Sequence, residues 1–113
     1  MKNKSNFLIK LVSTIILSSV VFAHPPSKVN LSVSSNVLAV IADHEVKQPK
    51  KHFIYEITVK LNRKDIISQT LSEQIGHTQS VSYTIPSLKK GDQLTVQASC
   101  NKFGSKKATL VIK

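Results

Sequence analysis

Short segments that alternate apolar and polar residues recur along this chain, and they limit its fold more than any other feature. The clearest is Phe-Ile-Tyr-Glu-Ile-Thr-Val-Lys-Leu at residues 53–61, where every odd position is apolar. A period of two residues is typical of a β-strand with one buried face. The same period recurs in the segments 29–33, 81–85, 94–100 and 108–112.

Two further segments complete the pattern. Residues 37–41 are continuously apolar, which favours a strand covered on both faces, and residues 66–71 form another short strand. Turn-forming residues separate the strands at 34–36, 62–64 and 89–92. About seven strands with a turn every ~8–12 residues, and no helical period, predict an all-β chain with an immunoglobulin-like β-sandwich fold.

Residues 1–23 have the features of an export signal. The first ten residues carry three lysines and no acid, and an apolar run diluted by Ser and Thr follows. Val21-Phe22-Ala23 then supplies a cleavage site, and the apolar run is too short to span a membrane stably. We therefore predict an exported protein, periplasmic or secreted, in which residues 24–113 form one domain without a membrane span after cleavage. An uncleaved N-terminal anchor is the alternative.

The chain is basic, with 16 Lys and Arg against 6 Asp and Glu. Three of the 16 and none of the acids lie in residues 1–23, which leaves 13 against 6 in the predicted domain. Such a surface attracts small anions. Nucleic acid is not an expected partner, because the charges are spread along the chain, Trp is absent and the aromatic residues belong to strands.

The only cysteine, Cys100, ends the strand predicted at 94–100 and begins a turn. A lone cysteine cannot form an internal disulfide, so it is buried and inert, paired between chains, or a metal ligand. Strand parity places Cys100 on the inward face and His52 on the outward face, at the start of its strand. Both can still meet at one end of the sandwich, where Phe103 is expected to pack and exclude water.

Three imidazoles join this thiol in a candidate metal site: His24, His44 and His52. An N₃S ligand set suits iron, zinc or copper and excludes magnesium and calcium. On zinc the four donors would form a closed tetrahedral site, whereas on iron they leave two positions open. If cleavage follows Ala23, the free amine and ring of His24 offer a copper chelate instead. The fourth histidine, His77, lies in a polar loop and is expected to be solvated.

The residues also resemble a known family. His24-Pro25-Pro26, His44, His52-Phe53-Ile54 and the turn Cys100-Asn101-x-Phe103-Gly104 are similar to the iron-binding domain of superoxide reductases, the desulfoferrodoxin and neelaredoxin group. The resemblance covers nearly all of residues 24–113. It implies an immunoglobulin-like sandwich with one non-haem iron, held by four histidines and an axial cysteine thiolate. It further implies that ferrous iron reduces superoxide to hydrogen peroxide at an open sixth position, with electrons from a donor protein.

Residue by residue, the resemblance implies that His24, His44, His52 and Cys100 are the metal ligands, with no catalytic residue beyond them. Two positions depart from the family pattern: Phe103 replaces the signature histidine, and Glu45 replaces a proline. The lysine before the family's first histidine is also absent, because Ala23 stands there.

The loop between His44 and His52 carries three lysines, here called the loop lysines: Lys47, Lys50 and Lys51. A lysine run is usually a solvated surface, and its functional interpretation is attraction of superoxide or another anion. The sequence contains no nucleophile–base–acid set, no phosphate-binding glycine loop and no paired carboxylates in a recognisable setting.

The alternative function is a non-enzymatic binding module. One form is a metal-binding or metal-carrying protein. The other is a sulfur-carrier partner like SoxZ, which shares the sandwich and a similar stretch at residues 49–54, but lacks both the metal site and the cysteine turn.

Overall fold

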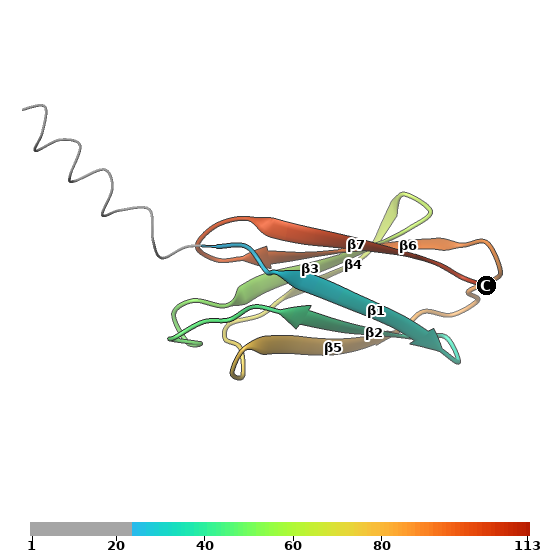
Figure 1. Cartoon of the computed structure of the whole chain (residues 1–113). Helices are drawn as coiled ribbons and strands as arrows, with labels where there is room; N and C mark the ends of the chain where they lie inside the picture. The colour runs from blue at the N-terminus through green and yellow to red at the C-terminus, as the bar shows by residue number, and fades with distance from the viewer. Residues whose placement is uncertain (1–23) are drawn as a thin grey trace, which may run out of the picture.

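The computed structural model describes residues 24–113, so the predicted export signal lies outside the described range. This part of the chain consists of seven strands in two antiparallel sheets (Figure 1). Within it there is no helix long and apolar enough to cross a membrane. The strands are β1 (Lys28–Ser34), β2 (Val37–Asp43), β3 (Ile54–Leu61), β4 (Lys64–Thr70), β5 (Thr78–Thr84), β6 (Gln93–Cys100) and β7 (Ser105–Val111).

One sheet has the order β1-β2-β5 and the other β4-β3-β6-β7. The connections β2–β3, β4–β5 and β5–β6 therefore cross between the sheets, while the connections β1–β2, β3–β4 and β6–β7 are hairpins. The predicted all-β, immunoglobulin-like sandwich is confirmed by this arrangement. At the β1–β2 hairpin both central residues have positive φ, 50° at Ser35 and 65° at Asn36, as a type I′ turn requires.

The core lies between the two sheets and is built from the inward residues that the alternation predicts. On β6 the buried residues include Leu94, Val96 and Ala98, which are fully buried, and Cys100 is 5% exposed. They pack against inward residues of β1 and β2 in the other sheet, namely Val29, Leu38, Val40 and Ala42.

The prediction that residues 37–41 are covered on both faces is wrong. Val37 is 38% and Ile41 45% exposed, whereas Leu38 and Val40 are fully buried. The strand is central in a three-stranded sheet, but only one face of that sheet meets the other sheet. Among residues 24–113 no element covers the opposite face.

A second difference from the expected pattern lies at the start of β3. The pairing with β6 shifts between Ile54 and Glu56, so that Tyr55 is an extra residue in a β-bulge. The alternation predicts Tyr55 on the buried face, but Tyr55 is 40% exposed and Ile54 is fully buried. The bulge thus reverses the buried face at Ile54, the first residue of β3.

Candidate metal centre

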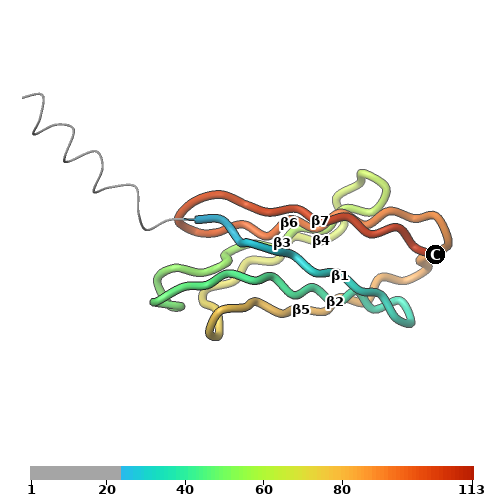
Figure 2. The backbone as a smooth tube through the Cα atoms, in the orientation of Figure 1, coloured from blue at the N-terminus to red at the C-terminus, as the bar shows by residue number. Residues whose placement is uncertain are grey.

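Four chain segments meet at one end of the sandwich (Figures 1 and 2). They are the segment before β1, the β2–β3 loop, the β4–β5 loop and the β6–β7 turn. The segment before β1 contributes His24, the β2–β3 loop contributes both His44 and His52, and Cys100 lies at the end of β6, where the β6–β7 turn begins. The β4–β5 loop contributes no predicted ligand. This end of the molecule therefore gathers residues that are far apart in the sequence.

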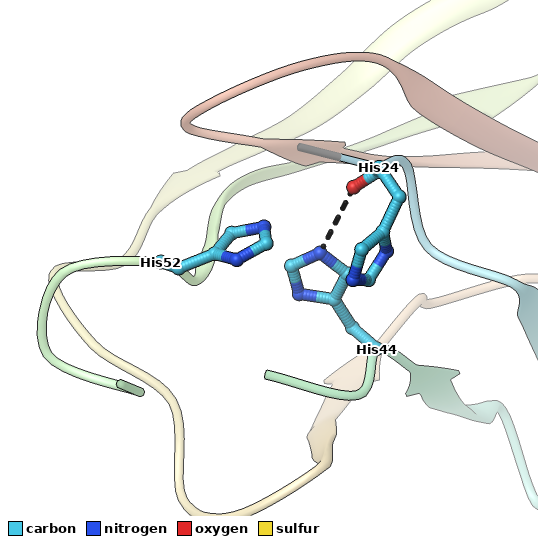
Figure 3. A group of neighbouring side chains, drawn as sticks. All are labelled: His24, His44 and His52. Atoms are coloured by element: carbon cyan, nitrogen blue, oxygen red, sulfur yellow. Dashed lines mark hydrogen bonds between the residues drawn. The ribbon is translucent and has the colours of Figure 1, made fainter. Parts of the chain in front are cut away.

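The three histidines of the predicted site lie together, with their rings directed toward one another (Figure 3). One ligand nitrogen from each of His24, His44 and His52 lies within 4.8 Å of the other two. The ring centroids are 4.8–5.1 Å apart. His24 is exposed, His52 is half-buried and His44 is fully buried. A metal ion could be held by this cluster and would remain accessible from the side of His24.

Cys100 lies beside the histidine cluster. Its Sγ is 3.2 Å from Nε2 of His52, and it accepts a hydrogen bond from the backbone N–H of Lys102 at 3.3 Å. Two ligands at about 2.1 Å (nitrogen) and 2.3 Å (sulfur) from one metal lie roughly 3.1–3.6 Å apart. The His52–Cys100 distance fits a shared ion, and the thiol contacts the cluster through His52.

The side chain of Asn101 ties the β6–β7 turn to the segment that carries His52. Its Oδ1 accepts the N–H of Phe53 at 2.9 Å, and its Nδ2 donates to the carbonyl of Lys51 at 3.0 Å. The N–H of Asn101 also donates to the carbonyl of Phe53 at 3.0 Å. These bonds hold the residues immediately before and after His52, so they fix the backbone of His52 next to Cys100.

The bulge at Tyr55 lies near the same contact. Sequence parity places His52 outward, but His52 lies in the turn before β3, two residues from Ile54, whose Cα pairs with that of Cys100. An extra residue re-aims a neighbouring side chain, a use of bulges common beside functional sites. No local signal in the sequence indicates this bulge.

The segment that carries His24 is held by a close backbone approach. Gly104 has φ +79°, and a Cβ at this position would lie only 2.9 Å from Cβ of Pro25. Only glycine fits such a contact without displacement. The β6–β7 turn therefore contacts the residue next to His24 as well as the segment next to His52.

Burial and positive charge both act on His52. Its pKa is lowered from the ordinary imidazole value by partial burial first, then by the positive charges of His44, His24 and Lys102. A lowered pKa favours the neutral ring, which is the form that binds metals. No sequence pattern indicates Lys102, because its place beside the site depends on the turn.

Gln74 is a second residue of the site that no sequence pattern indicates. It lies in the β4–β5 loop, which the sequence shows only as a polar stretch, yet it is 2% exposed. Its side chain contacts His44 through a hydrogen bond of 2.9 Å between Oε1 and Nδ1. A polar residue at a loop position gives no signal that it is buried.

Phe103 does not pack as predicted. Its side chain is 62% exposed and lines a surface groove with Tyr55 and Cys100. A turn of four residues between two strands leaves its tip in solvent, so Phe103 cannot seal the site. The exposed loop lysines occupy the β2–β3 loop as expected, and His77 is exposed, with Nδ1 accepting the N–H of Val46 at 3.3 Å.

The fold has a counterpart among known proteins. No family model matches the sequence, and no curated protein sequence matches it. The structure of the superoxide reductase (1Fe-SOR) from Giardia intestinalis aligns with 79% of this chain and 100% of its own, at a TM-score of 0.62 and 16% identity. The structure of a superoxide reductase from Nanoarchaeum equitans aligns with 79% of this chain and 92% of its own, at a TM-score of 0.47 and 13% sequence identity. The first of these alignments shows that the chain shares the fold of the Giardia protein.

The residues present fit a transition metal. Imidazole nitrogens and a thiol sulfur are ligands that iron, zinc and copper accept, and hard oxygen-seeking cations do not prefer them. The cluster also has the second layer of contacts that metal sites need, since Gln74 bonds His44 and the turn amide bonds Cys100.

Proposed function

We propose that this protein is a superoxide reductase-type enzyme that binds one iron through His24, His44, His52 and Cys100. The observation that carries the proposal is the convergence of three imidazoles at one end of the sandwich, with the thiol 3.2 Å from His52. The shared fold with a 1Fe-SOR supports the same assignment, including membership of that family.

Bound iron would supply the one electron that, with two protons, converts superoxide to hydrogen peroxide. The residues of the chain would hold the iron and attract the superoxide anion. Cys100 is held as a sulfur donor by the N–H of Lys102, and the buried His44 anchors the inner side of the cluster. The exposed side at His24 leaves a route for a small anion, and the loop lysines and Lys102 attract it.

Metal analysis of the wild-type protein and of Cys100→Ser tests the proposal. We expect stoichiometric iron in the wild type, with a thiolate-to-iron absorption band that is absent from Cys100→Ser. Superoxide consumption by the reduced wild-type protein, with one hydrogen peroxide formed per superoxide, would identify the reaction. Dismutation gives half that yield. Protein without iron, or with iron but no activity toward superoxide, contradicts the proposal.

A structural zinc site in a binding or metal-carrying module is the second candidate. The observation that favours it is Phe103, which stands at the place of the signature histidine and offers no nitrogen. Three nitrogens and one sulfur are a complete tetrahedral set for zinc. In this case the same metal analysis finds zinc, and removal of the metal lowers thermal stability without any loss of redox activity.

Export, the copper chelate and the carrier-partner function remain proposals with separate tests. Mass spectrometry of the protein from periplasmic or secreted fractions would show whether His24 is the first residue. A variant with one extra residue before His24 should lose copper if the amine binds it. A SoxZ-like role predicts co-purification with a small thiol-bearing carrier protein. The enzyme proposal predicts instead that an electron-donor protein reduces the metal-loaded protein.

A further inference from the structure

The side chain of Gln74 uses all of its hydrogen-bonding capacity within the metal centre. Its Nε2 donates to the carbonyls of His44 at 2.6 Å and Gly76 at 3.0 Å. Its Oε1 accepts the backbone N–H of Ile54 at 3.1 Å and lies 2.9 Å from Nδ1 of His44. The residue is 2% exposed, so water does not compete for these groups.

These partners fix the orientation of the Gln74 amide. The two carbonyl oxygens can only accept, so the group facing them must be the NH₂. The N–H of Ile54 can only donate, so the group facing it must be the oxygen. A rotated amide would place the NH₂ group against the N–H of Ile54 and the oxygen against the two carbonyl oxygens, and such unpaired buried groups are unfavourable.

The fixed amide in turn fixes the proton on His44. Because an oxygen faces Nδ1, that nitrogen must carry the hydrogen, and Nε2 of the neutral ring holds a lone pair. Nε2 lies 3.3 Å from the carbonyl oxygen of His24 (Figure 3). A ring with its hydrogen on Nδ1 does not donate to that oxygen, so Nε2 keeps its lone pair available for a metal ion.

We propose that Gln74 is a positioning residue that holds His44 in the Nδ1–H tautomer and presents Nε2 to the metal. The inference rests on the proposed metal site and adds which nitrogen of His44 binds. It also assigns a role to a loop residue that would otherwise be only a buried polar side chain. The physical basis is general, since partners of a metal-binding histidine set its tautomer and ring orientation.

Two substitutions separate this role from simple support of the fold. Gln74→Met keeps the length of the side chain but removes both the amide donors and the oxygen. Gln74→Glu removes the same two donors but keeps an oxygen acceptor for Nδ1–H. Gln69→Met is the matched control, because its amide oxygen accepts the Tyr83 hydroxyl at 2.5 Å and none of its bonds within residues 24–113 reaches a histidine.

The primary measurement is the tautomer of His44 in metal-free protein, by long-range ¹H–¹⁵N correlation about two pH units above the ordinary imidazole pKa of about 6.5. We expect the hydrogen on Nδ1 in the wild type, Gln74→Glu and Gln69→Met, and a mixture in Gln74→Met. The wild-type spectrum alone is decisive if Gln74→Met fails to fold. A wild-type His44 with its hydrogen on Nε2 would overturn the inference.

Zinc and iron affinity, from competition with a chelator, give the second readout. We expect Gln74→Met to bind about 10–100-fold more weakly than the wild type. Gln74→Glu should recover most of that loss, and Gln69→Met should bind as the wild type does. Equal affinity in Gln74→Met and the wild type would refute the positioning role. If no variant binds metal while the Nδ1–H tautomer is present, the proposed function fails and the tautomer assignment stands.

Discussion

Replacement of Gly104 by alanine should weaken both the fold and the histidine cluster. Gly104 has φ +79°, a conformation that costs an L residue roughly 1–2 kcal/mol. The new Cβ would also lie 2.9 Å from Cβ of Pro25, whereas carbon atoms pack at about 3.5–4.0 Å. Pro25 must therefore move by about 0.6–1.1 Å, and His24 is the residue before it.

Gly91 provides a matched control for the conformational part of this cost. It has φ +93°, and a Cβ built there meets nothing within 4 Å. Gly91→Ala should thus lose only the roughly 1–2 kcal/mol of the left-handed backbone, or about 4–16 °C in melting temperature for a domain of this size. The additional loss in Gly104→Ala measures the contact with Pro25.

Chemical denaturation and zinc or iron titration of both variants provide the assay. We expect Gly104→Ala to be less stable than Gly91→Ala and to bind metal about 10–100-fold more weakly than the wild type, because a ligand has been displaced. Gly91→Ala should keep wild-type affinity. Equal stability and equal affinity in the two variants would show that the turn does not support His24, and the reasoning would be wrong.

Three other substitutions test separate parts of the structure. Asp92→Asn should lower stability at neutral pH, because hydrogen bonds from the Asn62 amide and a backbone N–H lower the pKa of Asp92. Its carboxylate stabilises the fold above the unfolded value of about 3.9 and loses that effect as pH falls through the folded pKa, so the variant should show a flatter acid limb in denaturation. Leu94→Ala, at a fully buried position, should cost about 2–5 kcal/mol by urea denaturation. Replacement of all three loop lysines by Gln should slow the reaction with superoxide by up to about 10-fold and weaken its dependence on ionic strength, measured by pulse radiolysis; an unchanged salt dependence would exclude steering by these lysines.

Much of the fold follows from local patterns. The alternation on β6 correctly predicts the buried face of Leu94 and Val96, and residues 34–36 correctly predict a turn. These features need only neighbouring residues, since side-chain direction and turn geometry are properties of short segments. The wrong predictions concern features that depend on tertiary contacts. The exposed face of β2 depends on which elements lie beside its sheet, and the bulge at Tyr55 depends on the pairing with β6.

The candidate site divides in the same way. The candidate donors follow from the residue types, because one thiol and the imidazoles can be counted and their chemistry is intrinsic to each side chain. Which donors meet depends on how the strands pair and pack, since His52 and Cys100 are 48 residues apart and His44 and Gln74 are 30 apart. Contacts at that separation depend on the strand register, a bulge and buried hydrogen bonds, and no local pattern encodes these.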